Sequence, residues 1–327
     1  MKEENQLLKA YLQTMPCGLY VSGEDAYTFL QSQFSNDLPK EGRVFACYGL
    51  WLNAKGRVLA DSMIVGLDSE SFYIFSENTE ASFIKDTLEN HIIADDVSIE
   101  PIQLIGAIFV NSSAAEILIR ELGLISDEAE GVASNYIHTD LSVGVVYPRK
   151  RLEEDGFVFC FRDEINYRKC KKALEVQPVH WISENEIQLN RLALGMPLVP
   201  NEIGPSDLAG EGDLVPSAVS LTKGCYLGQE VVARLFHVGK PQRQLFVMTF
   251  NGLNEVDSIQ LPIEITKENR SLGELRTLYQ DTDNSNKWYG VALLKVRYLD
   301  VIESEFKIAD HSVDGLCRLS DFSLSGI

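Results

Sequence analysis

Residues Lys223–Arg234 read KGCYLGQEVVAR. Gly224 and Gly228 accept backbone angles that other residues adopt only at a cost, so the chain can turn on both sides of Cys225. After Gly228 the apolar side chains recur at spacings of three and four, which predicts a helix with one buried face that ends near His237. We therefore expect Cys225 to be displayed in a turn just before this helix.

The surroundings of Cys225 are unusual for a cysteine. A thiol close to a helix N-terminus lies in a partial positive potential, and the charge of Lys223 also favours the thiolate, whereas Glu230 opposes it. Two interpretations are open: a reactive or ligand-binding cysteine, or a small apolar residue that packs in the loop before the helix. No CxxC, CxxxC or Cys-x-His spacing surrounds it, so we expect no metal site closed by this chain alone.

Length, charge and cysteine content limit the classes of protein to which this chain can belong. A chain of 327 residues with 45% hydrophobic side chains has enough apolar material for two or three compact units. The net charge of −19 gives a surface field that repels nucleic acids and anionic membranes. Six scattered cysteines fit a reducing cytoplasm better than a disulfide framework, and no apolar run approaches the roughly twenty residues of a membrane helix. We expect a cytoplasmic protein without membrane or direct nucleic-acid partners.

One stretch of this acidic chain is rich in basic residues. Residues Arg149–Lys172 concentrate arginine and lysine and are the best candidate for a local basic face. Acidic residues are interleaved with them, which favours a solvated helix with mixed charges over a nucleic-acid surface. Nucleotide-cradling loops are not indicated either, since the chain has no GxGxxG after a strand and no GxxxxGK[ST].

The order of elements predicts an α+β fold. Through residues 1–240, patterns of helical and strand period alternate irregularly, which suggests two interleaved subdomains rather than a doubly wound sheet. From 241 to 327 short alternating segments and polar turns predict a small all-β unit, a barrel. Between these regions, Pro197–Gly224 is rich in glycine and proline and leads into the Cys225 turn; long ordered loops of this kind often carry function.

Taken together, the motifs resemble those of the YgfZ family of folate-binding proteins, relatives of the glycine-cleavage T-protein, the aminomethyltransferase GcvT. The family pattern KGCYxGQExxxR is matched at eight positions: Lys223, Gly224, Cys225, Tyr226, Gly228, Gln229, Glu230 and Arg234. Three weaker matches support it: LQSQFSNDL at Leu30–Leu38, LNAKGRVLAD at Leu52–Asp61, and RLALGMP at Arg191–Pro197. The β unit after Pro241 resembles the family's C-terminal barrel.

The resemblance implies a ring of three domains around a cavity that holds tetrahydrofolate or a derivative. It also implies a function: a folate-binding accessory protein that supports assembly or repair of iron–sulfur clusters in client proteins, and so affects tRNA modification indirectly. A transient cluster shared with a partner is part of this expectation. Two alternatives stay open, a folate-dependent aminomethyltransferase or other one-carbon transferase, and a folate-gated protein-binding module without catalysis.

Site residues follow from the same resemblance. Where the transferases carry carboxylates, this chain has Ala60 and Ala193, and it keeps Asp61. Cys225 would be a nucleophile, a redox thiol or a cluster ligand, tuned by Lys223. The motif positions Gly224, Tyr226, Gly228, Gln229 and Glu230 would hold the turn.

Folate needs an apolar slot with polar anchors for its ring and a cation for its carboxylate tail. The candidates are Arg57, Arg191, Arg234 and Asp61. Each has a structural alternative: a solvated turn-end charge for Arg57, a salt bridge for Arg191, an i, i+4 pair with Glu230 for Arg234, and a strand end for Asp61.

Overall fold

A computed structural model describes residues 7–40, 43–124, 136–152, 155–239, 241–253, 260–267, 270–298, 307–308 and 311–324. The chain divides into two compact units. The first contains Met1–Gly49 and Asp61–Ser183, and the second contains Leu50–Ala60 and Glu184–Ile327. The expected division of the chain at residues 240 and 241 stays a prediction.

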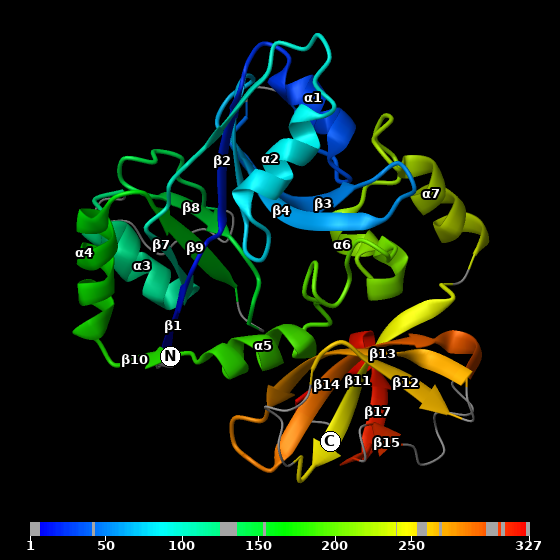
Figure 1. Ribbon diagram of the computed structural model, residues 1–327. Coiled ribbons are helices and arrows are strands. Elements are labelled where there is room, and N and C mark those ends of the chain that lie inside the picture. The colour runs from blue at the N-terminus through cyan, green and yellow to red at the C-terminus, as the bar shows by residue number, and fades with distance from the viewer. Residues whose placement is uncertain are drawn as a thin grey trace, which may run out of the picture. The chain divides into compact units, whose positions relative to one another are not determined.

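The first unit contains a mixed five-stranded sheet in the order β10-β1-β7-β9-β8. Its strands are β1 (Leu8–Gln13), β7 (Gly106–Asn111), β8 (Val145–Pro148), β9 (Gly156–Phe161) and β10 (Val179–Trp181). Helices α3 (Ser112–Glu121) and α4 (Glu164–Glu175) lie side by side against this sheet (Figure 1). Both begin at side-chain caps: Asn111 accepts a hydrogen bond from the Ala114 N–H at 3.3 Å, and Asp163 from the Asn166 N–H at 2.9 Å.

A second five-stranded sheet has the order β3-β4-β5-β2-β6. Its strands are β2 (Cys17–Ser22), β3 (Phe45–Leu52), β4 (Val58–Gly66), β5 (Ser71–Ser76) and β6 (Ser98–Pro101). Helix α1 (Ala26–Gln33) packs on β5, and α2 (Ala81–Glu89) on β2 and β6. The turn between β3 and β4 lies in Leu50–Ala60, which belongs to the second unit. The chain therefore enters and leaves the second unit within this hairpin and enters it again at Glu184.

The second unit combines short helices with a sheet. Its helices are α5 (Glu184–Ala193), η1 (Ala209–Gly212), α6 (Val215–Ala218), α7 (Gln229–Val238), η3 (Val296–Tyr298) and η4 (Leu319–Asp321). The sheet has the order β12-β13-β14-β11-β17 and its paired strands are antiparallel. These strands are β11 (Arg243–Asn251), β12 (Ile263–Lys267), β13 (Arg270–Gln280), β14 (Lys287–Lys295) and β17 (Gly315–Arg318). A separate short pair joins β15 (Lys307–Ile308) to β16 (His311–Ser312).

The α+β expectation is confirmed, and the predicted all-β character after residue 241 matches the strands of this sheet. Closure into a barrel stays a prediction, since the pairings within the described ranges give an open strand order. The stretch Arg149–Lys172 contains α4, whose charges form pairs such as Arg168–Glu164 and Lys171–Glu175. This agrees with a helix of mixed charges. In the described ranges, no helix combines the length and apolar character needed to cross a membrane.

The apolar core of the first sheet generates a stability prediction. Ile108 on β7 is fully buried in this core, whereas Ile165 on α4 is 79% exposed. Ile108→Ala should lower the free energy of unfolding by about 2–5 kcal/mol, because lost burial and a new cavity add. Ile165→Ala, the matched control, should change it by no more than about 0.5 kcal/mol. Urea titration of both variants checks this, and equal effects would contradict the described packing.

Candidate functional site

The KGCYLGQEVVAR segment forms an open turn followed by helix α7. Cys225 is exposed, as expected from its glycine neighbours, and α7 begins at Gln229. Gly228 is the N-cap residue and has a φ of +82°, in the left-handed region that favours glycine. The local signals in the sequence therefore placed the helix and the display of the thiol correctly.

Lys223 and Tyr226 are buried beneath this turn, with exposures of 8% and 6%. The Lys223 Nζ lies 5.4 Å from the centroid of the Tyr226 ring, in cation–π range. Burial raises the pKa of Tyr226 to about 12, and its hydroxyl has no hydrogen-bond partner among the described residues. Gln229 ties the turn together, since its Nε2 donates to the Lys223 carbonyl at 3.4 Å. A buried cation therefore lies two residues from the exposed thiol.

Gly228 rests directly on the turn between β3 and β4. A Cβ atom at Gly228 would lie 2.6 Å from the Asn53 carbonyl oxygen and 3.0 Å from the Gly56 Cα. Seen from the turn, the contact is similarly close: a Cβ atom at Gly56 would lie 3.0 Å from the Val231 Cβ of α7. Two sequence motifs, KGCYxGQE and NAKGR, thus meet through their glycines in the second unit.

Arg57 does not project into solvent as a free turn-end charge. Its Nη1 donates to the Ser206 carbonyl at 2.6 Å, and its backbone pairs with Leu208 in an isolated bridge. The neighbouring Val58 N–H donates to the Asp207 carbonyl at 3.0 Å. Arg57 therefore joins the β3–β4 turn to the glycine- and proline-rich loop that precedes Cys225.

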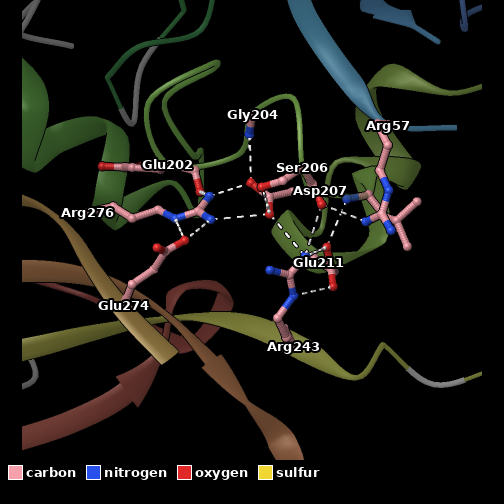
Figure 2. A network of polar contacts seen from close by, with 10 residues as sticks. Arg57, Glu202, Gly204, Ser206, Asp207, Glu211, Arg243, Glu274 and Arg276 are labelled. Atoms are coloured by element: carbon pink, nitrogen blue, oxygen red, sulfur yellow. Dashed lines mark hydrogen bonds and ion pairs between the residues drawn. The ribbon is translucent and has the colours of Figure 1, made fainter. Parts of the chain in front are cut away.

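Asp207 lies at the centre of a buried ion-pair network in the same loop (Figure 2). Arg276 donates to both of its carboxylate oxygens, Arg243 Nη2 donates to Oδ1 at 3.0 Å, and the Gly204 N–H donates to Oδ2 at 2.9 Å. Burial alone would raise the pKa of Asp207. The hydrogen bonds from Arg276 and Gly204 and the charges of both arginines outweigh burial and hold the pKa below its ordinary value.

The guanidinium of Arg191 makes five hydrogen bonds within the chain. Its guanidinium pairs with buried Glu202 through two hydrogen bonds of 2.7 and 2.9 Å. The other donors reach the Gln188 side chain, the Met196 carbonyl and the Tyr279 hydroxyl. All five N–H groups of a guanidinium are then used, which supports the salt-bridge interpretation and leaves no donor for a ligand.

Arg234 and Glu230 project from α7 and are both exposed. Over the described part of the chain, no ion pair joins them. Arg234 is thus placed as an exposed cation on the helix that follows Cys225, and a role in anchoring folate stays a prediction.

Asp61 lies in the first unit and is 7% exposed. The Tyr48 hydroxyl donates to its Oδ2 at 2.8 Å, and the Arg149 guanidinium stacks 4.5 Å from the centroid of the Tyr48 ring. Its other oxygen, Oδ1, is buried without a hydrogen-bond partner among the described residues. Burial raises the pKa of Asp61, against the opposing charge of Arg149. Asp61 is therefore part of a buried polar cluster and not simply a strand end.

Tyr48 and Arg149 were not identified from the sequence as members of this cluster. Arg149 and Arg151 both form ion pairs with Glu77, and Tyr48 joins Asp61 to Arg149. The available signal was the basic run that begins at Arg149, which the alternation of charges led us to interpret as a solvated helix. That interpretation holds for α4 but not for the residues before β9.

The two positions where the resemblance places the transferase carboxylates hold alanine in this chain. Ala60 is fully buried and Ala193 is the last residue of α5. The described residues also contain no group of three or more His, Cys, Asp or Glu side chains that could hold a metal ion. Among the described residues, two features stand out chemically: the exposed thiol of Cys225 in the second unit and the Tyr48–Asp61–Arg149 cluster in the first.

Comparison with known proteins supports the architecture. Residues 15–124 match the GCVT N-terminal domain family. The crystal structure of aminomethyltransferase T of the glycine cleavage system from Bartonella henselae superposes with a TM-score of 0.70 at 16% identity, over 89% of this chain and 79% of that one. This likeness confirms the GcvT-like fold.

Three curated relatives carry three different descriptions. Mouse mitochondrial iron–sulfur cluster assembly factor IBA57 is 26% identical over 71% of this chain and 63% of its own length. The tRNA-modifying protein YgfZ of Colwellia psychrerythraea is 24% identical over 81% of this chain and 79% of its own. The aminomethyltransferase of Caldanaerobacter subterraneus is 24% identical over 86% and 76%. The match thus spans less than two thirds of the mouse relative.

The contact at Gly228 generates a prediction with a control in the same motif. Gly228→Ala should lower the free energy of unfolding by about 1–3 kcal/mol, because its φ of +82° is strained for alanine and the new Cβ meets backbone atoms. Gly224→Ala should have little effect, since no atom lies within 4 Å of a Cβ there. Chemical denaturation measures both, and a neutral Gly228→Ala would refute the close approach of α7 to the turn.

The buried state of Asp61 generates a pH prediction. Because the pKa of Asp61 is raised in the folded protein, the folded state binds the carboxyl proton more tightly than the unfolded chain does. Asp61 therefore lowers the stability of the fold as the pH rises from the unfolded pKa through the folded pKa. In Asp61→Asn, the fall in unfolding free energy from about pH 4 to about pH 7 should be smaller than in the parent. The exposed helix residue Asp86 supplies the control variant Asp86→Asn. Parallel pH profiles for Asp61→Asn and the parent would contradict this assignment.

Proposed function

We propose that this chain, which is related to the YgfZ proteins, the IBA57 cluster assembly factors and the aminomethyltransferases, is a folate-binding accessory protein for iron–sulfur cluster assembly or repair. Effects on tRNA modification follow indirectly, through client enzymes that depend on clusters. Its partners are the client or assembly proteins that present the cluster. Nothing in the proposal requires direct binding to RNA, which a net charge of −19 disfavours.

The single observation that carries the proposal is the exposed Cys225 on a turn fixed by glycine contacts. Thiolate sulfur is the preferred ligand of iron in clusters, which take about four cysteine ligands each. One cysteine supplies one ligand, so the client or assembly protein supplies the others. In this role Cys225 contacts the cluster transiently.

The Tyr48–Asp61–Arg149 cluster supports folate binding. Asp61 Oδ1 is a buried acceptor without a partner. Arg149, whose Nε lies 3.3 Å from Glu77 Oε1 in an ion pair, is the cation beside it. A pterin edge presents ring N–H donors beside a carbonyl acceptor, and in this proposal Asp61 Oδ1 accepts from such a donor. Asp61 and Arg149 would hold the ring, and bound folate would supply one-carbon or redox chemistry at that position.

An accessory role also fits the two alanines. General acid–base catalysis needs a titratable group within hydrogen-bond reach of the proton it moves. Ala60 and Ala193 offer none at the positions where the resemblance places the transferase carboxylates. The relation to aminomethyltransferases thus concerns the fold, and transfer of an aminomethyl group is not part of the proposal.

Two variants separate the two parts of the proposal. Cys225→Ser should abolish recovery of cluster-enzyme activity and oxidant resistance in a deletion strain, while the purified variant keeps its affinity for tetrahydrofolate. Asp61→Asn should weaken tetrahydrofolate binding by about tenfold or more, because it removes a buried charged acceptor. Isothermal titration calorimetry and complementation measure the two effects.

The control is Cys47→Ser, which changes a partly exposed cysteine in the first unit and should leave both readouts unchanged. Full complementation by Cys225→Ser would remove the chemical role of the thiol. Unchanged tetrahydrofolate affinity in Asp61→Asn would remove the folate site from this cluster.

A further inference from the structure

We propose that Asp207 is a positioning residue for Cys225. It holds the turn on which the thiol is displayed, through an unbroken series of contacts within the second unit. The inference rests on the proposed function, in that it gives a use to the position of Cys225. Three steps connect the two residues, which are not themselves in contact.

The first step fixes the Asp207 side chain to the sheet. Arg276 projects from β13 and Arg243 from the start of β11, and both donate to the Asp207 carboxylate (Figure 2). Arg243 also forms two hydrogen bonds to Glu211, and Arg276 pairs with Glu274. Asp207 is 1% exposed, so these charges interact with little screening by solvent. The loop is thereby anchored to two separate strands.

The second step passes through the backbone of the same loop. The Asp207 carbonyl accepts from the Val58 N–H at 3.0 Å, and the Ser206 carbonyl accepts from Arg57 Nη1 at 2.6 Å. The turn held in this way is itself closed by Asn53, whose side chain accepts from the Arg57 N–H at 3.1 Å. The position of the turn relative to the loop is therefore set by directed hydrogen bonds.

The third step is the glycine contact between the turn and α7. Gly228 lies against Asn53 and Gly56 with no room for a side chain, so a shift of the turn must shift the start of the helix. Helix α7 also packs on η1, which begins two residues after Asp207 in the chain. Cys225 lies three residues before Gly228, and Gln229 ties that interval to Lys223. Hydrogen bonds and close packing thus transmit the placement of Asp207 to the thiol turn.

Charge explains why an aspartate suits this position. Three arginines converge on the loop, namely Arg57, Arg243 and Arg276, and Asp207 accepts from two of them while its own backbone binds the turn. Asparagine has nearly the same shape but one acceptor oxygen and no charge. In Asp207→Asn the arginines lose their shared anion, and the loop loses its anchor to β11 and β13 without any change at Cys225 itself.

The test measures the mobility of a nitroxide spin label on Cys225, in a background with Cys47→Ser and Cys317→Ser so that the most exposed cysteine reacts. Asp207→Asn should increase label mobility in electron paramagnetic resonance spectra at a temperature where circular dichroism shows a folded protein. In the unlabelled protein it should reduce complementation by about tenfold or more, since misplacing a reactive group by about 1 Å can cost about a hundredfold in rate.

The matched control is Glu274→Gln, which alters the same network on the side of Arg276 away from the turn. It should leave the label as immobile as in the parent. If Asp207→Asn fails to fold, Arg57→Met decides the question, because it removes the hydrogen bond to Ser206 without leaving a buried carboxylate unpaired. An unchanged spectrum in the folded Asp207 variant, or in Arg57→Met if that variant is used, overturns the proposal. Equal mobilisation by Glu274→Gln overturns it too.

Label mobility requires neither folate nor a client. Failure of the positioning role is therefore distinguishable from failure of the proposed function, which Cys225→Ser tests by complementation.

Discussion

The contact of Gly228 with the Asn53–Gly56 turn is the constraint on which the second unit's candidate site depends. Two backbone segments approach within the distance that a single methyl group would occupy. Because the contact is made at the glycines Gly228 and Gly56, packing against the main chain sets the orientation of α7. The position of the exposed Cys225 depends on that orientation. A reactive group on a loop is useful only when a rigid element fixes it.

Around this contact, the buried carboxylates of the described residues are paired with arginines, whereas the Tyr226 hydroxyl is buried without a partner. Asp207, Glu211 and Glu274 face arginines, and Glu202 faces Arg191. Such pairs contribute little net stability compared with apolar packing, yet they specify one arrangement, since leaving one partner unpaired is costly. The first unit differs at Asp61, where one carboxylate oxygen has no partner in the described structure. A buried polar atom without a hydrogen-bond partner is more typical of a functional site than of a purely structural region.

Sequence reasoning succeeded where the governing interactions are local. Glycine positions and the three-and-four spacing of apolar residues predicted α7 and the display of Cys225, because both depend on neighbours within a few residues. It missed the Tyr48–Asp61–Arg149 cluster, whose members come from β3, β4 and the segment after β8 and meet only in the folded chain. Arg191 stayed ambiguous for a related reason: its partner Glu202 lies in an irregular loop, where no period predicts which way a side chain points.

The saturation of Arg191 has a consequence for substitution. Its guanidinium joins α5, the Met196 carbonyl, the Glu202 loop and Tyr279 of β13 in one plane. Lysine would keep the charge but brings three donors from a single point, with no plane to orient them. This position requires both the charge and the planar shape of arginine. A lysine would keep the charge but would lose hydrogen bonds that connect helix, loop and sheet.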